Sequence, residues 1–208
     1  MKSIKILLTL FILLLSISSY SQKYEIGPSL GFTNVFGDQD NYQWSNAELG
    51  GGLIYKVNKN YRWSYRFSYH YLPTELQLPG STDNAGSFTP GNQIRIHEIA
   101  GGIEFNFFEY QKPHKRTNST PYFILQVAAM QFDNDFSVSI PIGLGFKTKL
   151  FSNIAIAIET RLNYSFSDDL EGGYSVVPDL NNRNDWYMFT GINLMYIFGR
   201  QECYTSPM

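Results

Sequence analysis

Residues 61–71 read YRWSYRFSYHY, and the fold can be worked out from this stretch. Its odd-numbered positions are all aromatic, whereas its even-numbered positions are arginine, serine or histidine. A period of two is the period of a β-strand, because successive side chains of a strand point to opposite faces of the sheet. We therefore expect a strand with one aromatic face and one polar face, the latter carrying Arg62, Arg66 and His70.

Seven further stretches complete a set of about eight expected strands. They span residues 24–32, 47–57, 98–107, 121–132, 136–147, 154–164 and 186–198. Most alternate between apolar and small or polar residues, but 121–132 is apolar on both faces, so its phase stays open. Pro141 has no N–H to donate to a neighbouring strand and predicts a β-bulge within its run. Strands of about 10 residues are long enough to cross a bilayer when tilted.

The composition narrows the class of protein. With 208 residues the chain has the size of one domain, and only 16% of its residues are charged, against roughly 25% in soluble proteins. The net charge of -2 lacks the basic excess of a nucleic-acid-binding protein. The single Cys203 excludes an internal disulfide and a metal site built from cysteines, and no cofactor motif is present.

The first 21 residues have the pattern of a signal peptide. Lys2 and Lys5 precede an apolar run over 6–17, which ends at the small-residue cleavage site Ser19-Tyr20-Ser21. An apolar run of about a dozen residues is too short for a membrane-spanning helix. We expect residues 1–21 to be removed on export and residues 22–208 to form one barrel that enters a membrane through its strands.

Two architectures fit eight such strands: a soluble lipocalin-like barrel, with the polar face outward, and an outer-membrane barrel, with the polar face inward. The polar face is rich in glycine, alanine and serine, which a solvated face does not need but a narrow eight-stranded lumen does. Its acids and bases nearly balance, as an interior ion-pair network requires. We therefore predict an all-β, eight-stranded, antiparallel, up-and-down transmembrane barrel of the outer-membrane type. The predicted lumen network comprises Glu25, Glu48, Arg62, Arg66, Glu98, Glu104, Glu159 and Arg161, with Lys56, Lys147 and Lys149 as further inward bases.

The connections predict the orientation of this barrel. Long outer loops and short periplasmic turns are typical of outer-membrane barrels. Three long connections (33–45, 72–93 and 167–184) and a short one (133–135) fall on one side, and tight turns near residues 59 and 152 fall on the other, which predicts periplasmic N- and C-termini. The connection 109–119 is longer than the other turns and basic.

Several motifs, taken in order, resemble the PorG family of outer-membrane barrels. They are Tyr24-Glu25-Ile26-Gly27, Phe36-Gly37-Asp38, EIAGGIEFNFF (98–108), IPIGLGFK (140–147), Asn184-Asp185-Trp186-Tyr187 and the tail pair Cys203-Tyr204. PorG is a component of the type IX secretion system of Bacteroidetes, which also drives gliding motility. The resemblance implies a non-enzymatic protein that contacts the periplasmic ring of PorK and PorN, called GldK and GldN in gliding species.

On this interpretation the partner-binding residues lie in the basic turn and the tail. The candidates are Lys112, His114, Lys115, Arg116, Arg200, Cys203 and Tyr204. The alternative is a small OmpA- or OmpW-like barrel that binds a hydrophobic ligand or stabilises the outer membrane. A third possibility, a membrane-embedded lipid A hydrolase or acyltransferase, requires a Ser/His/acid set at the outer rim.

Other candidate sites have simpler explanations. His70, His97 and Asp83 lack the spacing of metal ligands and are read as polar strand ends. Asp168 and Asp169 suggest a solvated acidic loop rather than acid–base catalysis or a calcium site.

Overall fold

The computed structural model describes residues 24–36, 47–75, 93–111, 118–132, 135–151, 153–166 and 186–199. Eight strands account for almost all of them. They are β1 (Tyr24–Phe36), β2 (Glu48–Asn58), β3 (Trp63–Glu75), β4 (Gln93–Asn106), β5 (Ser119–Phe132), β6 (Asp135–Phe151), β7 (Ile154–Ser165) and β8 (Trp186–Phe198). No helix in this part of the chain is long and apolar enough to span a membrane. The expected signal peptide lies outside the described residues.

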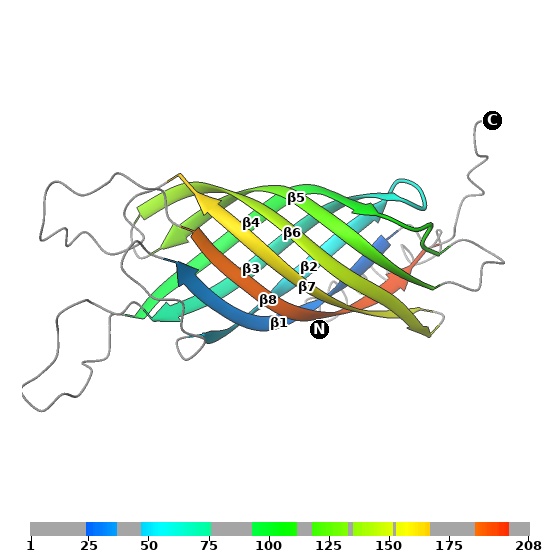
Figure 1. The fold of residues 1–208 in the computed structure, drawn as a ribbon, viewed down its shortest axis with the longest axis horizontal. Coiled ribbons are helices and arrows are strands. Elements are labelled where there is room, and N and C mark those ends of the chain that lie inside the picture. Colours follow the sequence, from blue (N-terminus) through cyan, green and yellow to red (C-terminus); the bar gives the residue numbers. More distant parts are fainter. Residues whose placement is uncertain are drawn as a thin grey trace, which may run out of the picture.

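The strands form a closed barrel in which each strand pairs with its sequence neighbours and β8 pairs with β1 (Figure 1). Every pairing is antiparallel. The predicted all-β, eight-stranded, up-and-down barrel is therefore confirmed, and closure leaves no strand edge unpaired.

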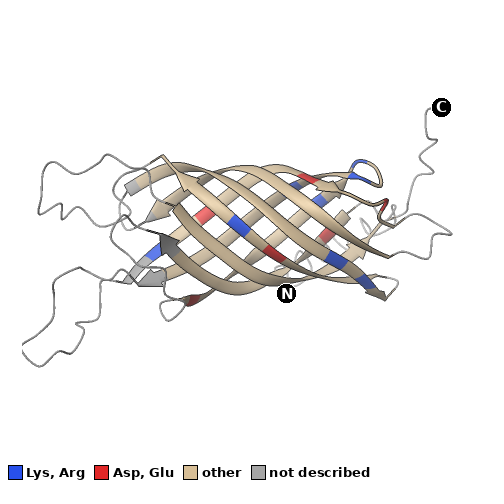
Figure 2. Ribbon diagram, viewed as in Figure 1, with Lys and Arg blue, Asp and Glu red and all other residues tan. Residues whose placement is uncertain are grey.

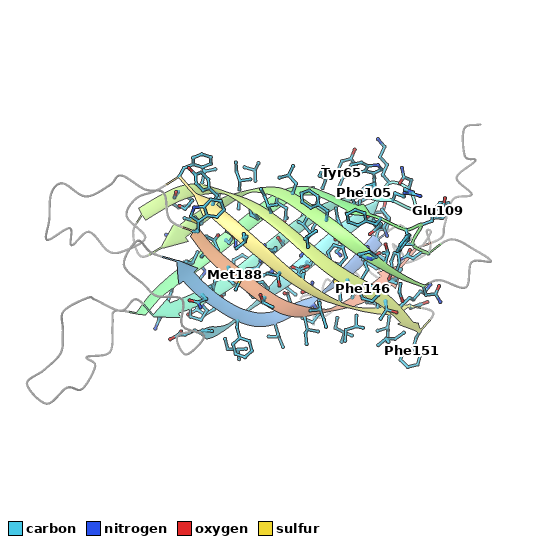
Figure 3. All side chains as sticks on the ribbon, in the orientation of Figure 1. Tyr65, Phe105, Glu109, Phe146, Phe151 and Met188 are labelled. Carbon is cyan, nitrogen blue, oxygen red and sulfur yellow. The ribbon has the colours of Figure 1, made fainter. Side chains whose placement is uncertain are left out.

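The two faces of β3 show which way the barrel is turned. Ser64, Arg66 and His70 are buried in the lumen, whereas the intervening aromatic residues, including Tyr65 and Phe67, are exposed. The large exposed side chains of the other strands are also mostly apolar and project outward around the barrel, as the labelled Tyr65 and Phe105 do in Figure 3, although some lumen positions, such as Phe189 and Ile197 of β8, are apolar too. A soluble barrel would have the opposite arrangement. The apolar exterior and polar interior are those of an outer-membrane-type barrel.

Strand β5 takes the phase that its sequence left open. Tyr122, Ile124 and Met130 face the lumen, and Leu125 and Val127 face outward. Both sets are apolar, so the alternation was invisible in the sequence. The lumen is therefore partly filled by large apolar and aromatic groups.

The bulge predicted at Pro141 is absent. The β5–β6 pairs on either side of it, Leu125↔Ile142 and Ala128↔Ser139, keep one register, and Pro141 itself pairs with Asn163 of β7. The register shift of β6 lies instead between Lys149 and Phe151. A strand position whose N–H is not needed by a neighbour accommodates proline without a bulge.

Glycines on the inner face make room for the large lumen residues. A Cβ at Gly145 would lie 2.4 Å from the ring of Tyr122, and one at Gly143 would lie 2.8 Å from the Arg161 side chain. The narrow lumen of an eight-stranded barrel explains this pairing of the smallest residues with the largest.

The two ends of the barrel differ in their connections. At one end, which we call the short-turn end, β2 joins β3 through 59–62, β6 joins β7 through 152–153 and β4 joins β5 through 107–118. The opposite, long-connection end carries 37–47, 76–92, 133–134 and 166–185. Strand β1 begins and β8 ends at the short-turn end.

Candidate functional site

The lumen contains a continuous network of ion pairs, and its first centre is Glu104 of β4. One carboxylate oxygen lies 2.7 Å from Lys56 Nζ and 3.3 Å from Arg66 Nη1. The other oxygen accepts a hydrogen bond of 2.5 Å from Lys147 Nζ. Glu104 and its three partners come from four strands and are all buried. A single carboxylate therefore ties β2, β3, β4 and β6 together across the lumen.

Glu159 of β7 is the second centre. Arg66 donates to both of its oxygens, through Nη1 at 2.9 Å and Nη2 at 2.6 Å. Tyr122 donates its hydroxyl hydrogen to the same carboxylate at 2.8 Å. This bidentate pairing uses the planar fork of the guanidinium, which lysine cannot reproduce. Arg66 thus connects Glu159 to Glu104.

Glu98 of β4 is the third centre, farther toward the long-connection end. It accepts hydrogen bonds from Arg161 at 3.0 Å and from the Tyr187 hydroxyl at 2.5 Å. His70 Nδ1 lies 3.5 Å from the same carboxylate. Arg161 stacks against the ring of Phe189, with its Cζ 5.1 Å from the centroid.

Charge in this network is balanced. Among the described residues, the buried lysine, arginine and carboxylate side chains are four bases and four acids: Lys56, Arg66, Lys147, Arg161, Glu25, Glu98, Glu104 and Glu159. Figure 2 shows basic and acidic positions along the same strands. Balance is what burial demands, because a buried charge without a partner costs several kcal/mol.

The predicted network needs one correction. Arg62 is exposed: it lies in the turn before β3 begins, and its Nη1 donates to the backbone carbonyl of Phe107 at 3.2 Å. The alternating pattern was extended beyond the start of the strand into the turn, and this extension placed Arg62 in the lumen. Glu48 is only half-buried, at the other end of β2. The remaining predicted members, Glu25, Arg66, Glu98, Glu104, Glu159 and Arg161, are buried in the lumen.

The predicted network did not include its tyrosines. Tyr122 and Tyr187 are buried, and each donates to a glutamate. Both occupy inward positions, but the pattern assigned aromatic residues to the outer face. The signal was available for Tyr187, since it falls between the outward Trp186 and Met188 in the alternation of β8.

The described geometry gives no support to a site that joins the two histidines. His70 is buried in the lumen, whereas His97 is exposed on the outer surface. In the described part of the chain no group of three or more His, Cys, Asp or Glu side chains is placed to hold a metal ion. The acidic residues at 168–171 and Asp83 lie outside that part.

The segment 107–111 lies at the short-turn end of the lumen, where its last two residues, Tyr110 and Gln111, are buried whereas Phe107 and Phe108 are exposed. Tyr110 is buried among apolar side chains that include Ile54 and Met195, and its N–H donates to the carbonyl of Tyr61 at 3.0 Å. Lys147 Nζ lies 4.4 Å from the centre of its ring. Burial, and then the negative charge of Glu25, raise the pKa of the Tyr110 phenol above its usual range.

Gln111 fastens the end of this segment. Its side-chain amide donates to Glu25 Oε1 at 2.9 Å, beside the amide of Asn58, which donates to the same oxygen at 2.9 Å. The backbone turns sharply at Gln111, where φ is 63°, a left-handed value that costs a non-glycine residue roughly 1–3 kcal/mol. The tertiary contacts of Tyr110 and Gln111 offset this strain.

The predicted partner-binding residues follow this segment or lie in the tail. All seven, Lys112, His114, Lys115, Arg116, Arg200, Cys203 and Tyr204, fall outside the described residues. The structure thus places the point from which the basic turn leaves the barrel, at Gln111.

Solved outer-membrane proteins have similar folds. The structure is similar to that of Neisserial surface protein A, with a TM-score of 0.54 and 11% identity over 85% of this chain and 97% of that chain. The structure is also similar to that of OprG from Pseudomonas aeruginosa, with a TM-score of 0.48 and 13% identity over 86% of this chain and 99% of that chain. For Ail, the attachment invasion locus protein of Yersinia pestis, the TM-score is 0.43 and the identity 16% over 84% of this chain and 99% of that chain. At these identities the likeness to Neisserial surface protein A concerns the fold alone.

Comparison of the sequence itself leads to a family. None of the curated proteins matches the chain. A family model described as "Domain of unknown function (DUF6089)" matches residues 4–207. Because this match covers nearly the whole chain, the protein belongs to the DUF6089 family.

Proposed function

We propose that the protein resides in the bacterial outer membrane, with the short-turn end and both termini in the periplasm. The apolar exterior supports this location, and Trp63 and Trp186 lie at opposite ends of the barrel as in interfacial aromatic girdles. The distribution of long and short connections supports the orientation.

Within that membrane the barrel acts as a non-enzymatic anchor for a periplasmic assembly. The observation that carries this proposal is the closed and filled lumen. Side chains bridge it at three glutamate centres, and Tyr110 covers its short-turn end. A lumen filled by charge-balanced ion pairs favours a rigid barrel over the passage of a solute. The function is therefore assigned to the rim of the barrel.

The partner is assigned from the resemblance to PorG-like proteins. It is the type IX secretion ring of PorK and PorN, or of GldK and GldN in a gliding species. The segment 107–111 supports a docking role for the basic turn, because its contacts hold Gln111, the residue that precedes 112–116 in the sequence, against the barrel. Residues 112–116 carry three basic side chains besides His114: Lys112, Lys115 and Arg116.

Co-purification tests the proposal. The tagged protein, extracted from outer membranes in mild detergent, is expected to bring down PorK- and PorN-like proteins. Replacing Lys112, Lys115 and Arg116 together with serine is expected to reduce that recovery strongly. The matched control is Lys59→Ser, which removes an exposed base from a different turn at the same end and leaves recovery unchanged.

A gel-shift assay of heat-sensitive barrel mobility shows whether each variant is folded. Wild-type protein that recovers no ring component, in a strain whose deletion mutant secretes normally, contradicts the ring assignment. That result favours the alternative, a small OmpA- or OmpW-like barrel that stabilises the membrane or binds a hydrophobic ligand. Recovery unchanged in the triple variant places the docking surface elsewhere on the rim.

A further inference from the structure

The outer surface of the barrel has a polar interruption near the long-connection end. We call it the polar patch: Tyr69 and Tyr71 of β3, Arg95 and His97 of β4, and Gln131 of β5. All five side chains are exposed. Register places them together, since Tyr71 and Gln131 are the two cross-strand partners of His97, and Arg95 is two residues along the same face. Among the strand side chains whose burial is described, Arg95 and His97 are the exposed charged or imidazole groups.

The patch holds its histidine in a defined position. Tyr69 Oη lies 2.9 Å from His97 Nδ1, and the Tyr71 ring lies 5.1 Å, centroid to centroid, from the imidazole. When the tyrosine hydroxyl donates to Nδ1, the proton of the neutral ring is on Nε2, a donor for an anion. Arg95 and His97 have Cα atoms about 7 Å apart on the same face of an extended strand. At this separation, the two side chains can both contact a single phosphate group.

We propose that the polar patch binds a phosphate of lipid A in the outer leaflet. This inference rests on the proposed location and orientation, which put the long-connection end at the cell surface. An arginine that faces lipid near the end of a membrane-spanning strand lies close to the headgroup phosphates. Its planar guanidinium binds phosphate through paired hydrogen bonds. Tyrosines are enriched at the same depth. Lipid A supplies phosphates on a large apolar body that fits the adjoining surface, where Phe67 and Ile99 are exposed.

Binding of lipid A to the full-length, detergent-purified barrel tests the proposal, with native mass spectrometry or fluorescence titration as the readout. The probes are bisphosphorylated lipid A, enzymatically dephosphorylated lipid A and phosphatidylglycerol. We expect Arg95→Gln with His97→Gln to weaken binding of the bisphosphorylated form at least about tenfold, because two charge-assisted or polar contacts are lost. Arg95→Lys retains the positive charge but not the planar guanidinium, so its affinity for bisphosphorylated lipid A is expected to lie between those of the wild type and the double variant. Thr160→Ala is the matched control, since Thr160 is an outward polar residue paired with Thr190 on β7 and β8.

Each alternative outcome overturns the proposal. Equal affinities of the wild type for phosphorylated and dephosphorylated lipid A would mean that only the acyl chains bind. Equal affinity for phosphatidylglycerol would overturn the assignment to lipid A. Equal loss in Thr160→Ala and in the double variant would remove the patch as the site. Recovery of ring proteins with the same variants separates the lipid A proposal from the anchor proposal. Loss of lipid A binding with normal recovery of ring proteins leaves the anchor proposal intact. Normal lipid A binding without recovery of ring proteins contradicts the anchor proposal and not the lipid A proposal.

Discussion

Replacing Glu104 with glutamine is the sharpest test of the lumen network. The substitution keeps the shape of the side chain but removes the charge that Lys56, Lys147 and Arg66 share. Removing one partner of a buried ion pair costs about 3–5 kcal/mol, because the other partner is left uncompensated. Of the three bases, Arg66 retains Glu159, so the cost falls mainly on the two lysines. We therefore expect a loss of about 3–5 kcal/mol in the free energy of unfolding.

Urea unfolding of the refolded barrel in lipid vesicles, followed by tryptophan fluorescence, measures this loss. A second variant, Glu104→Gln with Lys147→Met, restores the charge balance of the lumen. It is expected to recover about 1–3 kcal/mol relative to Glu104→Gln alone, the range of coupling for residues in one network. A single variant within about 1 kcal/mol of the wild type, or a double variant less stable than the single one, would refute the reasoning. Lys59→Ala, at an exposed turn, is the control and should change stability by less than about 0.5 kcal/mol.

Two further predictions concern packing and the lipid-facing surface. Gly145→Ala is expected to destabilise the barrel by about 1–3 kcal/mol, because the new Cβ would meet the Tyr122 ring at 2.4 Å. In contrast, Gly101→Ala meets its nearest atom at an ordinary 3.5 Å and should be nearly neutral, so equal losses in the same urea titration would contradict the glycine argument. Leu144→Arg, in the middle of β6, should cost about 2–4 kcal/mol in a bilayer, and Leu150→Arg, near its end, about 0–1 kcal/mol. Equal costs at the two positions would argue against a bilayer around β6.

Alternation in the sequence was enough to predict the barrel, because most inward positions of β3 and β7 are polar or small whereas most of their outward neighbours are aromatic or aliphatic. It was also enough to place Glu98, Glu104 and Glu159 inside. The prediction failed where the alternating pattern did not show the phase of a strand or the residue at which a strand begins. Both faces of β5 are apolar, so Tyr122 was not recognised as a lumen residue, and Arg62 was placed inside because the turn before Trp63 continues the same alternation.

The short-turn end was beyond prediction for a different reason. The hydrogen bond from Gln111 to Glu25 joins residues 86 positions apart, and Tyr110 is buried against residues as distant in the sequence as Met195. No local pattern carries such contacts. The polar patch was missed because its members lie on three strands. In the sequence, His97 is a candidate only together with His70, which lies on the opposite face of the sheet.

Photo-crosslinking from the rim tests the central claim most directly. A photoreactive amino acid at Lys115, in cells that express the full-length protein, is predicted to capture a PorK- or PorN-like ring component. The same group at Leu144, on the outer face of the barrel, is predicted to capture none. If the protein is folded in the outer membrane and the group at Lys115 captures no ring protein, the proposed anchoring role is contradicted.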